Sequence, residues 1–104
     1  MYYIVSMNRN NMYDIKEVSN YLADEENSNE IFNFIVEMLT ESELETLSKR
    51  WQILKMLGEG KTQRVIANDL KVSLCKVTRG AQLLKNKDSV AAKYLKWRYN
   101  YERM

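Results

Sequence analysis

Residues 63–80 read QRVIANDLKVSLCKVTRG, and this stretch decides the fold. Ile66 and Leu70 lie four residues apart, as the buried positions on one face of a short helix do. Residues 71–73 (Lys-Val-Ser) follow as a turn, and the hydroxyl of Ser73 can cap the N-terminus of a second helix. The stretch therefore predicts a helix-turn-helix.

The second helix of this motif opens at Leu74 and packs back onto the first. Val77 and Gly80 are the positions that turn toward the first helix, where Ala67 supplies the small residue that a close crossing needs. Two helices fixed at a steep angle let the second one enter the major groove of DNA. The motif favours DNA binding, and the alternative is a plain helical corner of an interaction domain.

The composition predicts a single small all-helical domain. The chain has 104 residues, no proline and only three glycines, and it lacks the alternating apolar pattern of strands. Cys75 is the only cysteine and histidine is absent, which argues against an internal disulfide, a zinc finger and Cys/His catalysis. Because there is also no Gly-rich phosphate loop and no motif of paired carboxylates, we do not expect an enzyme.

The sequence shows neither a signal peptide nor an apolar run of membrane-spanning length. With a single cysteine, this pattern fits a reducing compartment. We expect a soluble, cytoplasmic protein that has no membrane partner.

Charge is strongly segregated along the chain. Residues 1–46 carry ten acidic and two basic residues, whereas residues 47–104 carry four acidic and fourteen basic ones, so the halves sum to −8 and +10. The basic half contains the helix-turn-helix, which indicates a polyanionic partner there. The alternative is that the two halves pair with each other in a dimer.

The rest of the chain predicts helices on both sides of the motif. Residues 1–12 have no helical period and are read as a loose N-terminal arm, followed by one helical domain over residues 13–104 with the helix-turn-helix at 62–85. A first helix is expected from about Tyr13 to Glu25. A second, capped by Ser28, should be heavily buried because apolar residues cover most of its circumference: Ile31, Phe32, Ile35, Val36 and Leu39.

A third helix starts with a capping box, in which Thr40 and Glu43 serve each other's backbone amides. Its apolar stripe is long and continuous, as a helix that spans a dimer needs: Leu44, Leu47, Trp51, Leu54 and Leu57. Gly58 and Gly60 end it, and Thr62 caps the next helix. A last helix from about Asp88 should bury the residues on one of its sides: Val90, Tyr94, Trp97 and Tyr101.

A wider pattern runs from Met38 to Lys85, and it includes a Thr-Arg-Gly triplet inside the second motif helix. Its positions are Met38-Leu39-Thr40, Glu43, Leu47, Arg50, Ile53, Gly60, Thr62-Gln63-Arg64, Leu70, Val77-Thr78-Arg79-Gly80 and Leu84-Lys85. With six helices in this order, the chain resembles the tryptophan repressor family. The resemblance implies an all-α, six-helix fold, an intertwined homodimer whose first three helices interlace, and tryptophan as the corepressor of the type member.

The resemblance also implies candidate effector-binding residues. They are Leu39, Thr40, Arg50, Arg79, Gly80 and Leu83. Two arginines and a hydroxyl suit a carboxylate, but Leu83 stands where the family has a serine that meets the amino group of the ligand. Trp51 also replaces a smaller residue. We expect tryptophan to bind weakly or not at all, and the alternative for Arg50 and Thr40 is a structural role.

The candidate DNA-binding residues are Lys61, Gln63, Arg64, Ser73, Leu74, Cys75, Lys76, Thr78, Arg79 and Lys85. By resemblance Arg64 points into the groove, where an arginine can bind guanine with two hydrogen bonds. Leu74 and Cys75 suit a thymine methyl, and the three lysines suit phosphates. Thr78 can reach a base or a phosphate, and Arg79 serves either DNA or an effector carboxylate.

These observations predict a sequence-specific transcriptional regulator of the repressor type. It would act as a homodimer on double-stranded DNA, at a palindromic operator, with a small-molecule corepressor or none. The alternative is a helical assembly module in which DNA contact is weak or absent.

Overall fold

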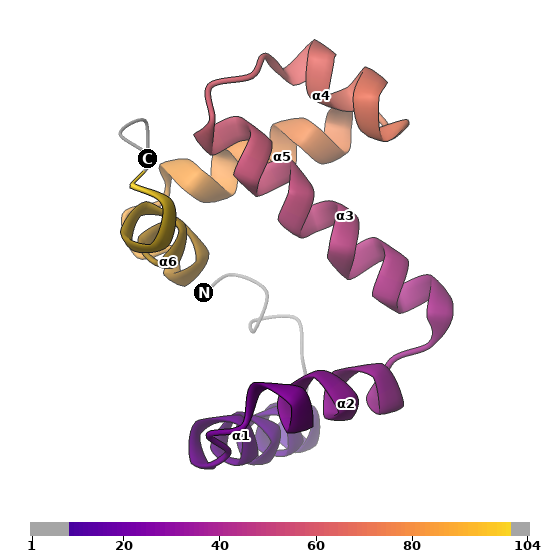
Figure 1. The fold of residues 1–104 in the computed structure, drawn as a ribbon, viewed down its shortest axis with the longest axis vertical. Helices are drawn as coiled ribbons and strands as arrows, with labels where there is room; N and C mark the ends of the chain where they lie inside the picture. Colours follow the sequence, from indigo (N-terminus) through magenta and orange to yellow (C-terminus); the bar gives the residue numbers. More distant parts are fainter. Residues whose placement is uncertain (1–8, 101–104) are drawn as a thin grey trace. The chain divides into compact units, whose positions relative to one another are not determined.

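In a computed structural model, residues 9–100 are described; they form six α-helices and no strand (Figure 1). The helices are α1 (Arg9–Asp24), α2 (Ser28–Met38), α3 (Glu41–Gly58), α4 (Gln63–Leu70), α5 (Leu74–Lys85) and α6 (Val90–Tyr99). The expected all-helical class and helix order are confirmed. The chain divides into two compact units, Met1–Thr40 with α1 and α2, and Glu41–Met104 with α3 to α6.

In the first unit, α1 begins earlier than the sequence pattern indicated. It starts at Arg9 and not at Tyr13, because residues 9–12 contain no glycine or proline that would stop a helix from continuing backward. Residues 1–8 of the predicted arm lie outside the described residues. Where α1 meets α2, the rings of Tyr21 and Phe34 lie with their centroids 4.5 Å apart.

The cap of α2 is Asn27, so the prediction of Ser28 was wrong by one residue. The side-chain oxygen of Asn27 accepts hydrogen bonds from the backbone N–H groups of Asn29 (2.9 Å) and Glu30 (3.3 Å). Asn27 has extended backbone dihedrals, whereas Ser28 is already the first helical residue. Asparagine caps a helix as well as serine does, and the sequence alone left both open.

The heavy burial expected for α2 is not seen within the first unit. None of its residues is buried, and the side chains of Phe32, Val36 and Met38 are exposed, Phe32 by 63%. In the first unit, α2 therefore presents an exposed apolar surface.

In the second unit, α3 begins at Glu41, directly after Thr40, and ends at Gly58, as the sequence predicted. Gly60 has a φ of 92°, a conformation that a residue with a side chain rarely adopts. The predicted stripe of α3 is correct only in part. Leu54 is buried, but Leu47 and Trp51 are exposed.

The helix-turn-helix is present with the predicted bounds. Thr62 caps α4, since its side chain accepts a hydrogen bond from the backbone N–H of Val65 at 3.3 Å. The turn between the two helices contains Lys71 in the left-handed region, with φ 54° and ψ 49°. Ser73 then caps α5 by accepting from the N–H of Lys76 at 3.3 Å.

The core of the second unit lies where α3, α4 and α5 meet. Ile66 of α4 and Val77 of α5 are completely buried, and they form one cluster with Ile53 of α3. Gly80 of α5 allows the closest approach, because a Cβ placed there would lie 2.8 Å from the Cγ2 atom of Ile53. Ile53 does not belong to the predicted stripe of α3, so the structure adds it to the core.

The buried face of α6 differs from the prediction. Ala92 and Leu95 are buried, whereas Val90, Tyr94 and Trp97 are exposed, Trp97 by 77%. Tyr101, the fourth predicted position, lies outside the described residues. Helical spacing predicts the aromatic residues as core, but the buried residues of α6, a helix that contacts α3 and α5, are a small alanine and a leucine. Trp51 and Tyr94, with centroids 6.1 Å apart, therefore lie at the edge of this packing.

The core predicts a clear difference between two neighbouring residues of α4. Ile66→Ala should lower the free energy of unfolding by about 2–5 kcal/mol, because it leaves a cavity in a completely buried site. Val65→Ala is the matched control; its side chain is 46% exposed, and we expect a loss below about 1 kcal/mol. Urea denaturation of both variants at one protein concentration measures the difference, and equal losses would contradict this assignment of the core.

Candidate nucleic-acid interface

The packing of α5 divides its surface into an inner and an outer face. Val77 is buried and Gly80 lies against α3, so these two residues define the inner face. Six other residues of α5 are exposed: Leu74, Cys75, Lys76, Arg79, Gln82 and Lys85. This outer face carries three basic residues and no acidic one, and an anionic partner is therefore favoured on it.

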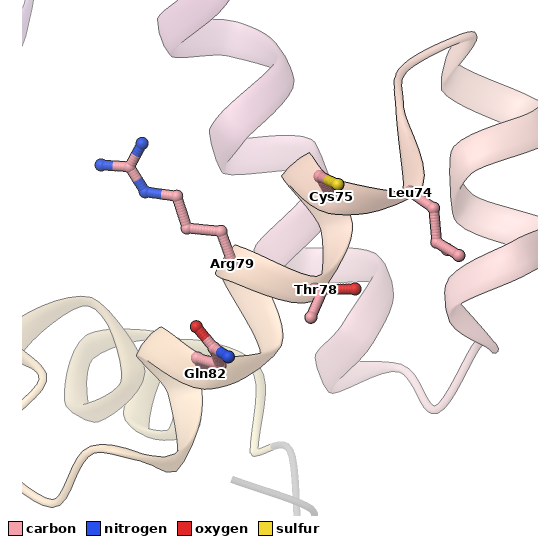
Figure 2. Close-up of a pocket in the computed structure, with 5 residues that line it drawn as sticks. All are labelled: Leu74, Cys75, Thr78, Arg79 and Gln82. Carbon is pink, nitrogen blue, oxygen red and sulfur yellow. The ribbon is translucent and has the colours of Figure 1, made fainter.

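An open hollow lies on this outer face. It is lined by Leu74, Cys75, Thr78, Arg79 and Gln82, all from α5. Figure 2 shows these side chains projecting from successive turns of the helix, with Arg79 reaching furthest from it. The structure brings four of the predicted DNA-binding residues together here.

Gln82 is the lining residue that the sequence analysis missed. It follows Cys75, Thr78 and Arg79 at the spacing i, i+3, i+4, i+7, which places all four on one side of a helix. Continuing this spacing from the predicted residues would have found it. Its amide can both donate and accept hydrogen bonds, as the edge of a base requires.

Two predicted residues form a hydrogen bond between α4 and α5. The Thr78 hydroxyl donates to the Oε1 atom of Gln63 at 2.8 Å, and both side chains are half-buried. Gln63 is the first residue of α4, so the bond ties the start of one motif helix to the middle of the other. Thr78 is thus occupied with a protein partner.

The remaining predicted DNA-binding residues lie at the ends of the two motif helices. Lys61 precedes α4, Arg64 is its second residue, and Lys85 is the last residue of α5; all three are exposed. Ser73 is the cap of α5, and its oxygen is used by the backbone of that helix. The thiol of Cys75 is free and exposed at the start of α5.

The second unit as a whole is basic. Residues 41–104 contain fourteen basic and seven acidic residues, a net charge of +7, whereas residues 1–40 contain two basic and seven acidic residues, a net charge of −5. The segregation of charge seen in the sequence therefore follows the division into units. The positive unit is the one that holds the helix-turn-helix.

The candidate effector residues are distributed over both units. Leu39 and Thr40 belong to the first unit, at the end of α2 and just before α3. In the second unit, Arg50 is exposed on α3 and Leu83 is half-buried on α5.

The space next to Gly80 is filled by apolar side chains of α3. The atoms nearest to a Cβ built at this glycine belong to Ile53, Leu54 and Leu57, at 2.8, 3.5 and 3.4 Å. The open hollow that includes Arg79 lies instead on the outer face of α5. Arg79 thus lines the outer hollow, while Gly80 serves the crossing of α5 with α3.

No helix within residues 9–100 is long and apolar enough to cross a membrane. Residues 9–100 also contain no group of three or more histidine, cysteine, aspartate or glutamate side chains arranged to hold a metal ion.

Two short helices joined by a three-residue turn, with a capped and exposed basic second helix, define a helix-turn-helix protein. The chain matches the family model described as Trp repressor protein over residues 13–98. It belongs to this family, which consists of helix-turn-helix DNA-binding regulators. The match covers most of the chain and confirms the resemblance. Neither the comparison with curated proteins nor the comparison with solved structures found a match.

Proposed function

We propose that this protein is a sequence-specific transcriptional repressor that acts as a homodimer on a palindromic operator. The observation that carries the proposal is the outer face of α5, which is exposed and basic while the inner face is fixed against α3 at Gly80. A helix held in this way can enter a major groove without disturbing the core. Membership of a regulator family supports the same reading.

Six exposed residues in or beside the motif have a proposed role on DNA. Arg64 binds guanine through O6 and N7, since only arginine among the exposed residues of α4 offers a fork of donors. Leu74 and Cys75 contact thymine methyl groups at the start of α5. Lys61, Lys76 and Lys85 bind phosphates and set the register of the protein on the duplex.

The proposed dimer accounts for the apolar surface that one chain leaves exposed. In the first unit this surface comprises Phe32, Val36 and Met38 of α2; in the second it includes Val90 and Trp97 of α6. A small chain gains much of its stability when such surfaces are covered by a partner. In the proposed dimer residues 13–104 function as one DNA-binding domain, and two symmetry-related heads favour a palindrome.

We also propose that tryptophan is not the effector of this protein. Leu83 stands on α5 one turn after Arg79, and its side chain has no group that can accept a hydrogen bond from the amino group of an amino acid. A charged amino group left without a partner loses affinity strongly. The proposed repressor therefore responds to another small molecule or to none.

For DNA binding, we expect two substitutions to act in different ways. Arg64→Ala removes a base contact, so it should cost about 1–3 kcal/mol on the preferred site and relax the preference at one base pair. Lys85→Ala removes a phosphate contact, so it should weaken binding to all sequences alike and reduce the slope of log K against log salt by about one unit. Site selection from a random pool, followed by titrations at several salt concentrations, measures both. If no palindrome is enriched, the result favours the alternative function, a helical assembly module in which DNA contact is weak or absent.

For the homodimer, we expect the midpoint of denaturation to rise with protein concentration. Dissociation and unfolding are coupled when a chain leaves large apolar surfaces exposed on its own, and mass action then favours the folded dimer. Sedimentation equilibrium at micromolar concentration should give about twice the chain mass of 12.4 kDa. A folded monomer under these conditions would disprove the proposal.

For the effector, isothermal titration calorimetry with L-tryptophan should show weak binding or none. Leu83→Ser restores a hydrogen-bonding group, and we expect this variant to bind tryptophan more tightly than the wild-type protein does. Micromolar affinity of the wild-type protein would contradict the proposal. If Leu83→Ser has no effect, the next hypothesis to test is that the indole of Trp51 obstructs the binding of tryptophan.

A further inference from the structure

The hydrogen bond between Thr78 and Gln63 differs from the other hydroxyl bonds made within helices of this protein. Ser19 and Thr46 donate to the backbone carbonyl four residues earlier, Ile15 and Ser42, at 3.0 Å in both cases. This local bond is the usual choice for a hydroxyl in a helix. Thr78 instead donates across to α4, to a residue fifteen positions away in the sequence.

This bond fixes which end of the Gln63 amide is used inside the protein. The oxygen Oε1 accepts the proton of Thr78, and the Nε2 group carries two further N–H donors. Gln63 is half-buried, so part of its side chain remains accessible. An amide held by its oxygen presents its two N–H donors to a partner.

The position of Gln63 indicates what this partner is. Gln63 is the first residue of α4, where backbone N–H groups and the helix dipole favour a negative charge. Adenine recognition by glutamine needs Oε1 as an acceptor, and Thr78 already occupies one of the two lone pairs of this atom. A phosphate offers only acceptors, which matches an amide that offers donors.

We propose that Thr78 is a positioning residue that orients the Gln63 amide to donate a hydrogen bond from Nε2 to a DNA phosphate. This inference rests on the proposed function, because it needs a DNA complex, but it assigns Thr78 a role through Gln63 and no contact of its own with DNA. The contact is neutral and independent of sequence. It adds affinity and fixes register without adding a counterion to the salt dependence.

The test is a double-mutant cycle on full-length protein, with titrations of the selected operator and of unrelated duplexes. Gln63→Ala should weaken binding by about 2- to 12-fold for each head, and by the square of this factor for a dimer that uses both heads. The loss should be equal on all duplexes, and the salt slope should not change. Thr78→Val should weaken binding less, whereas Thr78→Ser should restore the wild-type affinity.

The cycle separates a positioning role from a direct contact. If Thr78 acts through Gln63, Thr78→Val should have no further effect in the Gln63→Ala background. If the two losses multiply, Thr78 touches DNA itself and the inference is wrong. A changed preference at one base pair in Gln63→Ala would also overturn it, because it would assign Gln63 to a base.

Gln52→Ala is the matched control. Gln52 is also a glutamine bonded to a hydroxyl, that of Ser48 at 2.9 Å, but both residues belong to α3. We expect this variant to bind every duplex as the wild-type protein does. Circular dichroism on each variant verifies that the fold is kept.

A measurement without DNA distinguishes failure of this inference from failure of the proposed function. In ¹⁵N-labelled protein, Thr78→Val should shift the side-chain amide signals of Gln63, and Thr78→Ser should leave them near their wild-type positions. Unshifted signals in Thr78→Val would refute the positioning role even if the protein binds DNA. A protein that shows these shifts but binds no duplex would refute the proposed function and the phosphate contact with it.

Discussion

The close approach of α5 to α3 at Gly80 is the constraint on which the rest of the second unit depends. A Cβ at this position would lie 2.8 Å from the Cγ2 atom of Ile53, a distance that requires the core to shift. Because glycine avoids this clash, Val77 reaches the interior and completes the cluster with Ile53 and Ile66. The crossing of α5 with α3 therefore determines how the core packs. It also determines which side chains of α5 are turned toward solvent.

The turn before α5 fixes where this outward face begins. Lys71 adopts the left-handed conformation, which costs a residue with a side chain on the order of 1–2 kcal/mol. Ser73 then satisfies a backbone N–H of the first turn of α5. The strain at Lys71 persists because the buried cluster on both sides of the turn holds the two helices in place. The core, the turn and the cap of α5 thus act together to fix the positions of Leu74 and Cys75.

Features that depend on neighbouring residues could be predicted from the sequence, and features that depend on distant ones could not. The two motif helices, their caps at Thr62 and Ser73 and the end of α3 all follow from local hydrogen bonds and backbone preferences. The buried face of α6 depends on its packing against α3 and α5, so helical spacing of the large apolar residues predicted Tyr94 and Trp97 in place of Ala92 and Leu95. The position of Gln82 in the hollow could likewise be predicted from helical spacing. The hydrogen bond from Thr78 to Gln63 could not, because it joins two helices and no pattern of neighbouring residues indicates it.

The division of charge between the units has a consequence for selectivity in the proposed complex. Cations attract every DNA sequence, so an excess of them strengthens binding to the wrong sites as much as to the right one. The acidic first unit, at −5, opposes the +7 of the second and leaves the chain at only +2. In the proposed complex, discrimination then comes from the guanine contact of Arg64 and from the residues of the hollow that can meet base edges at short range, Leu74, Cys75 and Gln82. A moderate net charge combined with short-range base contacts favours the ratio of specific to non-specific binding over affinity alone.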